Sequence, residues 1–448
     1  MLTVSEAEGR AGALVEAALK AGADAADVLY IGDAATEVQV RLGELEDVTR
    51  SEGEEIGLRL FVGRRSASVS SSDLSTDALA ALVERAAAMA REAPEDPYAG
   101  LAPADRLLRG IAPDLAADDG ADPSPVALKE QALAIEEAAR AVPGITNSEG
   151  AGVSAGRNVV ALATSQDFAR GYTTSGYGAG VSVIGGEGGD MQRDSASHSV
   201  RHYADLDAPE TLGRLAADRT VRRLHPGTLA SGVMPVLFDP RVGGSLIGAL
   251  LGAMGGPGIA RRTSFLLGRE DELLFDPAIV IVDDPHRPRG LKAKPFDGEG
   301  VATAPSRLID GGRLTGWLLN AAAARQLGLE SSGHATRGIG GAPGVGATNV
   351  HMEPGALSPA ALMADVKLGL YVTEMIGSGV NPVTGDYSRG ASGYLIRDGA
   401  LAGPVDEITI AGNLLAMFRA LTPANDLEFR RAVNVPTLRI DGMTVAGA

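Results

Sequence analysis

The sequence contains no cysteine among its 448 residues. This absence excludes disulfide bonds, thiolate metal ligands and a cysteine nucleophile. A chain of this length does not need such cross-links, because two domains of about 200 residues can each bury a sufficient core. A chain without disulfides suits a reducing compartment, and its beginning lacks the basic and apolar regions of a signal peptide. We therefore expect a cytoplasmic protein.

Basic residues are scarce relative to acidic ones, with 40 against 57, so that the formal net charge is -17. Such a surface repels the phosphates of nucleic acids. Neighbouring basic residues occur as isolated pairs, such as Arg64 and Arg65, rather than as a basic patch. Nucleic acid is therefore not an expected partner.

Long hydrophobic runs are also missing, apart from the uncharged residues 242–260. This run contains seven glycines and Pro257, and Arg261 follows it directly. A membrane-spanning helix needs about 20 mainly apolar residues without such interruptions. We predict a short buried helix followed by a glycine loop, and no membrane span.

The periodic segments predict an α+β fold of two domains, residues 1–225 and 226–448. In the first domain the order helix, strands, helix occurs twice, which predicts helices packed on antiparallel sheets with a loose internal duplication. The second domain is richer in glycine and in strands. The predicted helices cover residues 5–23, 76–92, 126–142, 209–224, 242–254, 318–327, 358–367 and 408–421. The predicted strands cover residues 26–31, 36–42, 45–51, 56–62, 66–71, 153–164, 178–184, 195–203, 234–238, 278–282, 313–319, 393–397, 401–403 and 438–440.

Two short motifs are similar to catalytic signatures. His198 and His202 have the HxxxH spacing of zinc peptidases, but no glutamate lies between them. The alternation around them predicts a strand, on which they would be about 13 Å apart, too far for one zinc ion. Ser154 stands in a G-x-S-x-G pattern, which serves hydrolases at a strand-to-helix turn. A β-like run follows it here, so we interpret the motif as a glycine-rich turn that opens a strand.

Three polar residues, Asp283, Asp284 and His286, follow a predicted strand and could bind a hard cation. A polar turn closed by Pro285 and Pro288 explains them as well.

Two glycine-rich segments have two interpretations each. Residues 338–346 match neither a dinucleotide-binding nor a phosphate-binding loop. Their backbone either approaches a partner chain or a peptide closely, or forms a plain surface loop. Residues 381–394 crowd small and hydrogen-bonding side chains together. They either contact another backbone, as in strand addition, or form a tight turn that enters a hairpin.

Three segments resemble a known family. Residues 381–418, NPVTGDYSRGASGYLIRDGALAGPVDEITIAGNLLAMF, resemble the C-terminal signature of the PmbA/TldE proteins. Residues 333–355, GHATRGIGGAPGVGATNVHMEPG, resemble the segment that precedes it. The N-terminal stretch EGEEIGLRLFVGRRSASVSSSDLS is similar as well, so the resemblance extends over essentially the whole chain.

The resemblance implies a role in proteolysis. In this family the TldD branch resembles a zinc peptidase with HExxxH on a helix, and the PmbA/TldE branch is its partner in a heterodimer. The implied substrates of the pair are unfolded peptides and leader peptides. The implied partner of this chain is a TldD-type zinc peptidase subunit, and a homodimer is the alternative assembly when that subunit is absent.

The helix expected to carry HExxxH corresponds to residues 248–253. Gly248 and Ala253 stand where the histidines belong, and Ala249 stands where the glutamate belongs. None of these side chains can bind a metal or move a proton. We predict no catalytic residue, no metal ligand and no cofactor in this chain, with zinc in the TldD-type partner.

Two functions remain open from the sequence. In the first, the chain is a non-catalytic subunit that shapes a peptide-holding cavity and supports its zinc-bearing partner. The residues then predicted to contact peptide or partner are Asn381, Thr384, Asp386, Ser388, Gly390 and Ser392. In the second, the chain is itself a hydrolase that uses Ser154 or a metal site at residues 283–286.

Overall fold

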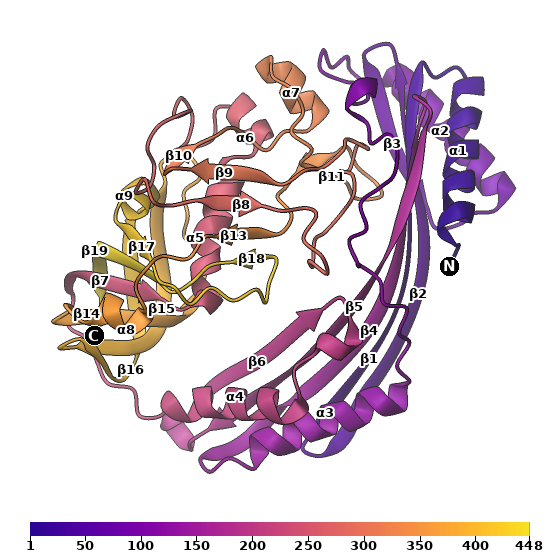
Figure 1. Ribbon diagram of the computed structural model, residues 1–448. Helices are drawn as coiled ribbons and strands as arrows, with labels where there is room; N and C mark the ends of the chain where they lie inside the picture. The colour runs from indigo at the N-terminus through magenta and orange to yellow at the C-terminus, as the bar shows by residue number, and fades with distance from the viewer. Residues whose placement is uncertain (448) are drawn as a thin grey trace.

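The first half of the chain forms one curved sheet of six antiparallel strands, in the order β3-β2-β1-β4-β5-β6. The computed structural model describes residues 1–447. Figure 1 shows the sheet bending around the second half of the chain, with four helices on its outer face. The helices are α1 (Val4–Lys20), α2 (Thr76–Glu92), α3 (Pro125–Arg140) and α4 (Pro209–Arg222). The strands are β1 (Ala25–Arg41), β2 (Glu44–Val62), β3 (Arg65–Ser71), β4 (Ile145–Thr164), β5 (Phe168–Gly185) and β6 (Gln192–Val200).

The internal duplication is confirmed in this sheet. One unit runs α1-β1-β2-β3-α2 and the other runs α3-β4-β5-β6-α4. The two units meet where β1 pairs with β4, in a regular antiparallel ladder from Asp27↔Thr164 to Val40↔Ala151. The helices therefore pack on one shared sheet rather than on two.

The outer face of the sheet is held by two apolar clusters. Helix α1 begins with a capping box in which Thr3 and Glu6 satisfy each other's backbone N–H groups. Its side chain Leu14 packs with Leu58 of β2 under α1 and α2. A second cluster, which includes Leu128 of α3, lies under α3 and α4. Burial of these apolar faces stabilises the long sheet.

Glycines do not interrupt the first strands, so the predicted division of β1 and of β2 into two runs each is wrong. Gly32 pairs with Glu54 on one side and with Val159 on the other. Because both ladders continue through this residue, its missing side chain does not end the strand. Gly53 of β2 likewise pairs with Asp33.

The second half of the chain contains a barrel and a second sheet. Strands β16, β15, β14, β7 and β19 follow one another, and an additional β16–β19 pairing closes them. The strands of this barrel, with β17 beside β19, are β7 (Gly232–Phe238), β14 (Leu368–Ile376), β15 (Asp386–Arg397), β16 (Ala400–Asn413), β17 (Leu421–Pro423) and β19 (Leu438–Ala446). The second sheet has the order β10-β9-β8-β13-β18 and consists of β8 (Ile281–Asp283), β9 (Ser306–Asp310), β10 (Arg313–Leu314), β13 (Val350–Met352) and β18 (Val433–Asn434). A two-stranded sheet joins β11 (Ala335–Thr336) and β12 (Gly344–Val345).

The helices of the second half are short. They are α5 (Pro240–Ala253), α6 (Gly256–Ala260), α7 (Ala321–Leu327), α8 (Pro359–Met363) and α9 (Leu414–Arg419). The uncharged run 242–260 thus lies mostly in α5 and α6. Within residues 1–447, no helix combines the length and the apolar character needed to cross a membrane.

The predicted helix over residues 408–421 is wrong in its first half. Ile408 and Ile410 are 2% and 0% exposed and continue strand β16 into the barrel core. Their alternation is the strand period of two, which outweighs the helical propensity of the following leucines. Asn413 ends the strand and caps the short α9 through its side chain, which accepts from the N–H of Leu415 at 3.1 Å.

A proline-rich segment, residues 93–124, connects the two units of the sheet and contacts the second half of the chain. We call it the strap. Leu107 of the strap forms a bridge with Val301, and Arg106 donates to Glu330 at 2.6 Å. Leu107 also belongs to a core cluster with Phe168 and Phe296, whose rings meet edge to face at 5.3 Å. The strap is therefore part of the packing between the two halves.

Candidate functional site

Helix α5 occupies the position that the sequence assigned to a degenerate metal motif, and the predicted helix is confirmed there. Asp239 caps it by accepting from the N–H of Arg241 at 2.9 Å, and Pro240 takes the first turn. Leu246 and Leu250 are fully buried in the core of the second half. The exposed positions of the helix are Ser245, Gly248 and Gly252.

The three motif positions do not share one environment. Gly248 is exposed, and a Cβ atom placed on it or on Gly252 would meet no atom within 4 Å. Ala249 is half-buried, and Ala253 is turned into the hydrophobic core. Gly248 and Gly252 line a cavity, whereas Ala253 does not.

This space, which we call the α5 cavity, has a volume of about 580 Å³. Its walls come from α5, from the segments that precede β9 and α7, from β11 and β12, from the turn before β13, and from β18. They consist of Gly248, Leu251, Gly252, Lys292, Lys294, Leu318, Thr336, Val345, Gly346, Ala347, Thr348 and Val433. The only charged residues in this wall are lysines. No motif in the sequence singles out these two lysines, although only five lysines occur in the chain and two stand in the short run Leu291–Lys294.

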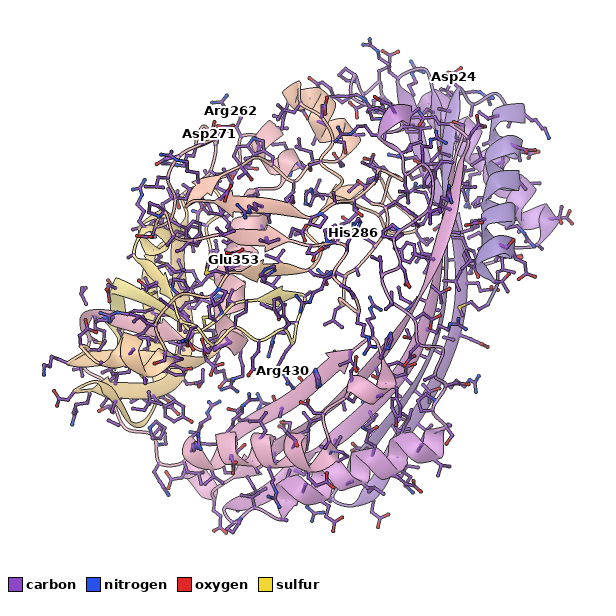
Figure 2. All side chains as sticks on the ribbon, in the orientation of Figure 1. Asp24, Arg262, Asp271, His286, Glu353 and Arg430 are labelled. Atoms are coloured by element: carbon purple, nitrogen blue, oxygen red, sulfur yellow. The ribbon has the colours of Figure 1, made fainter. Side chains whose placement is uncertain are left out.

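A second space, the interdomain cleft, has a volume of about 570 Å³ and separates the sheet from the second half of the chain. Ser195, Ser197 and Ser199 of β6 line it on one side, and Arg430 and Arg431 line it on the other. Figure 2 labels Arg430 where the second half faces β6. Because β6 is an edge strand, one side of its backbone faces away from the sheet.

The two histidines of the HxxxH spacing do not form one site. His198 lies on β6, as the strand prediction required, and its Nδ1 is 3.2 Å from Asp207 Oδ1. Burial lowers the pKa of His198 below its ordinary value. His202 lies beyond the strand, and its Nε2 contacts the carbonyl oxygen of Ala116 at 2.8 Å. The two rings therefore have separate partners.

Ser154 lies in the interior of β4, so the predicted turn at the G-x-S-x-G motif is wrong. The residue pairs with Glu37 of β1 and with Gly178 of β5. A nucleophilic serine of this motif needs a sharp turn into a helix, which raises its hydroxyl above the sheet. A strand paired on both sides does not provide that geometry.

The polar residues after β8 are held by different groups. Asp283 is 1% exposed and accepts from the N–H of Thr348 at 2.9 Å, and its Oδ2 lies 3.1 Å from Nε2 of His334. His286, labelled in Figure 2, places its Nε2 3.0 Å from Thr303 Oγ1. Among residues 1–447, no group of three or more histidines and carboxylates is arranged to hold a metal ion.

The glycine loop of residues 338–346 contacts the first half of the same chain near its start, at Ile339. At this point the loop is neither a contact with another chain or a peptide nor a plain surface loop, which were the two interpretations of the sequence. A Cβ atom on Gly57 of β2 would lie 1.9 Å from the carbonyl oxygen of Ile339. The neighbouring Arg337 pairs with Asp27, which also pairs with Arg59. The loop thus docks closely onto β1 and β2.

The segment predicted to bind peptide or partner has two parts. Asn381 and Thr384 form an exposed turn, where the Asn381 side chain accepts from the N–H of Val383 at 2.9 Å. Thr384 donates to Asp386 at 2.7 Å, and this bond lowers the pKa of Asp386. These contacts give the exposed part the chemistry of a hairpin turn.

The remaining residues of that segment belong to β15. Ser388 and Gly390 pair with β16, and Gly390 and Ser392 pair with β14. Strand addition to this part is therefore excluded, since its backbone is already paired on both sides. Ser392 is 5% exposed and contacts Arg223 and Glu374 at 3.0 and 3.1 Å, so it joins the two halves of the chain.

The chain matches known proteins over nearly its whole length. A family model described as the PmbA/TldA metallopeptidase C-terminal domain matches residues 231–447. Models described as the central domain and as domain 1 of these metallopeptidases match residues 118–224 and 26–90. Metalloprotease PmbA of Escherichia coli O157:H7 is 37% identical over 426 residues, which cover 95% of this chain and 92% of that protein. A metalloprotease PmbA homolog of Haemophilus influenzae is 34% identical over 438 residues, with coverage of 97% and 94%.

Solved structures share the fold. A protein of Bacteroides thetaiotaomicron described as a modulator of DNA gyrase superimposes with a TM-score of 0.92 at 26% identity, over 100% of both chains. TldE from Thermococcus kodakarensis gives a TM-score of 0.87 at 21% identity, over 99% of this chain and 100% of that chain. At 21% identity the second likeness concerns the fold alone.

Proposed function

Because the chain belongs to the PmbA/TldD family of metallopeptidases, we propose that it is the non-catalytic subunit of a two-chain zinc peptidase. A TldD-type partner would hold the zinc and carry out hydrolysis. This chain would hold peptide substrates, either unfolded peptides or leader peptides, close to the partner's active site.

The observation that carries the proposal is the surface of α5. The positions that the resemblance assigns to HExxxH hold Gly248, Ala249 and Ala253, which offer zinc no nitrogen, sulfur or carboxylate ligand. The residues on this helix therefore do not fit a zinc ion. Ser154 gives the alternative of a stand-alone hydrolase no support, because its strand is paired on both sides.

The free edge of β6 supports the peptide-holding part. The N–H of Ser195 bonds to Asp194 Oδ1 at 2.7 Å, and Arg219 of α4 donates to the Ser195 carbonyl at 2.9 Å. Since strand backbones repeat every two residues, Ser197 and Ser199 direct their N–H and C=O groups the same way. Ser197 and Ser199 also line the interdomain cleft. Backbone groups at such a strand edge can pair with an extended peptide of any sequence.

The exposed turn at Asn381 and Thr384 is our candidate for the partner-binding surface. Two apolar side chains of this region, Ile376 and Val383, are 65% and 54% exposed. Exposed apolar side chains of this kind can serve as contacts for a partner.

The test is reconstitution of the two subunits. This chain and a TldD-type subunit are purified separately and assayed on unfolded casein, alone and mixed, with and without a chelator. We expect turnover only in the mixture, and we expect the chelator to abolish it. Elemental analysis of this chain alone after dialysis should find no stoichiometric zinc. Chelator-resistant turnover by this chain alone would contradict the proposal.

The partner surface is tested by Val383→Asp, because a charge in an apolar interface is costly to desolvate. Ile111→Asp is the matched control, since Ile111 is 97% exposed and lies on the strap. We expect Val383→Asp to weaken pairing at least tenfold and Ile111→Asp to leave it unchanged, with both variants melting like the parent. Equal pairing by both variants would remove the turn from the interface.

A further inference from the structure

The α5 cavity has two features that suit the binding of an anion. It lies beside the helix whose motif positions have no ligands, and it is lined by Lys292 and Lys294 without any acidic residue. Two of the five lysines of a chain with a net charge of -17 therefore lie in one wall that contains no acidic residue.

The backbone around both lysines is held in place. The N–H of Lys292 donates to the side chain of Asn349 at 2.9 Å. The N–H of Lys294 donates to the carbonyl of Pro285 at 3.1 Å, and its carbonyl accepts from Thr303 Oγ1 at 2.8 Å. The lysines are thus presented to the cavity by a segment with fixed geometry rather than by a free loop.

The ammonium group of Lys294 has no carboxylate partner within 4 Å among residues 1–447. It donates to the carbonyl oxygen of Ala335 at 3.1 Å. The nearby Asp283 already accepts from Thr348 and lies against His334.

The other nearby acid, Asp297, accepts from three backbone N–H groups, those of Glu299, Val301 and Ala335. Burial lowers the pKa of Lys294, which reflects the cost of its charge in this position. An anion in the cavity would offset that cost, because buried charges are stable mainly when they are paired.

The remaining walls of the cavity are mainly apolar, with Thr336 and Thr348 as their polar side chains. Leu251, Leu318 and Val345 flank the lysines, and Gly248 and Gly252 leave the space in front of α5 open. A volume of about 580 Å³ lies within the range typical of ligand pockets. Walls of this kind suit a carboxylate that is joined to apolar groups, whereas inorganic phosphate would gain nothing from the leucines.

We propose that the α5 cavity binds the carboxylate of a peptide through Lys292 and Lys294, with an apolar side chain of the peptide against Leu251 and Leu318. The carboxylate comes either from the C-terminus of the peptide or from an acidic side chain. This site rests on the proposed function for its peptide ligand, but its binding reaction needs neither the partner nor catalysis. The chain would then retain a substrate subsite next to the position where its family's zinc motif is missing.

The test measures binding of three short peptides to the isolated chain by calorimetry. N-acetyl-Ala-Leu-Leu is used as the free acid and as the C-terminal amide, and the amide of N-acetyl-Ala-Glu-Leu supplies a side-chain carboxylate. We expect the free acid to bind at least tenfold more tightly than its amide. Tighter binding of the glutamate peptide than of the free acid would assign the carboxylate to a side chain, and equally tight binding would show that the site accepts both sources. Indistinguishable binding of all three peptides, or tighter binding of inorganic phosphate, would overturn the proposal.

Variants locate the site. Lys294→Met keeps most of the side-chain volume but removes the charge, and it should weaken binding of the free acid at least tenfold. Lys294 is half-buried and bonds to the Ala335 carbonyl, so its loss could disturb folding. Lys292→Met, at an exposed position, is therefore a second variant with the same expected direction. Lys367→Met is the matched control, since Lys367 is exposed and pairs with Asp398 on the surface.

Carboxylate binding that survives both cavity variants would place the site elsewhere and overturn the proposal. The outcome is independent of the reconstitution assay. Peptide binding without partner-dependent turnover would refute only the proposed function, and turnover without binding in the α5 cavity would refute only this inference.

Discussion

Two glycines in regular elements, Gly57 of β2 and Gly248 of α5, have opposite environments. A Cβ atom on Gly57 would lie 1.9 Å from the Ile339 carbonyl oxygen, whereas one on Gly248 would meet nothing within 4 Å. The first glycine is required by a close backbone contact between the two halves of the chain. The second leaves a cavity open. A glycine in the sequence therefore identifies either a packed contact or an accessible space, and only the three-dimensional environment distinguishes them.

The charges around these two glycines differ in the same way. Near Gly57, Asp27 pairs with both Arg59 and Arg337, and Glu299 lies 3.9 Å from Arg59. In the α5 cavity the charged groups are lysines without carboxylate partners in the wall. At the packed contact, acidic and basic side chains of the chain itself lie against one another, whereas the cavity wall offers basic side chains alone.

The largest effect is expected from Gly57→Ala, which places a methyl group against the backbone of Ile339. Relief of this clash requires movement of one half of the chain, so we expect a loss of about 3 kcal/mol or more in the free energy of unfolding. Urea denaturation measures it. Gly152→Ala is the control, because a Cβ there has an ordinary contact of 3.8 Å with the carbonyl of Val38. Similar stabilities of the two variants would show that the loop is not packed on β2.

The next effect concerns how the stability of the folded chain depends on pH through Glu299, which lies at the packed contact. Burial raises the pKa of Glu299 from 4.5 to about 7. The folded chain therefore binds a proton that the unfolded chain has released, and stability falls as the pH rises from 4.5 to 7. Glu299→Gln should remove this dependence and gain as much as about 3 kcal/mol over the parent above pH 7.

Thermal melting of the parent and of Glu299→Gln between pH 5 and pH 8 tests this expectation. Glutamine can still accept from the N–H of Ala321, as Glu299 does at 2.7 Å. The variant therefore keeps this hydrogen bond and removes only the titratable group. Parallel pH profiles of the two proteins would mean that Glu299 is charged in the folded state at neutral pH.

A smaller gain in stability is expected from Gly248→Ala. Alanine is about 0.5–1 kcal/mol better than glycine in a helix, and the open space of the α5 cavity accepts its methyl group. Gly243→Ala in the same helix is the control, because its Cβ would lie 3.1 Å from a methyl group of Val435. Urea denaturation should show that the first variant is more stable than the parent and that the second gains less or loses stability.

The smallest effect is expected from Ser154→Ala. The hydroxyl lies on a strand paired on both sides, so we expect a change in stability below about 0.5 kcal/mol and no change in turnover by the reconstituted pair. A loss of several hundredfold in turnover, measured on unfolded casein, would revive a serine mechanism.

The local parts of this structure were predictable from the sequence, whereas the contacts between distant residues were not. The helix at residues 76–92 and the strand alternation at 66–71 follow from patterns over a few residues. The same reasoning failed at Ile408, where a strand period precedes a helical turn within one apolar run.

The candidate site also has a part that the sequence shows and a part that only the fold shows. The empty motif positions on α5 are visible in the sequence. Their proximity to Lys292 and Lys294 is not, because the fold brings together segments separated by some forty residues. The docking of Ile339 on Gly57 joins opposite parts of the chain, and no local pattern indicates it.

The strap has a consequence for the order in which the chain assembles during synthesis. Its residue Arg106 contacts Glu330, which is made 224 residues later. Domains generally fold as they leave the ribosome, N-terminal part first. Here the two units of the sheet can pair early. The strap between them lacks part of its packing until the second half has emerged, because the cluster around its residue Leu107 includes Phe296 and Val301 as well as residues of the sheet. A nascent chain arrested before residue 330 should therefore bind chaperones through the strap, and one arrested after the barrel is complete should not.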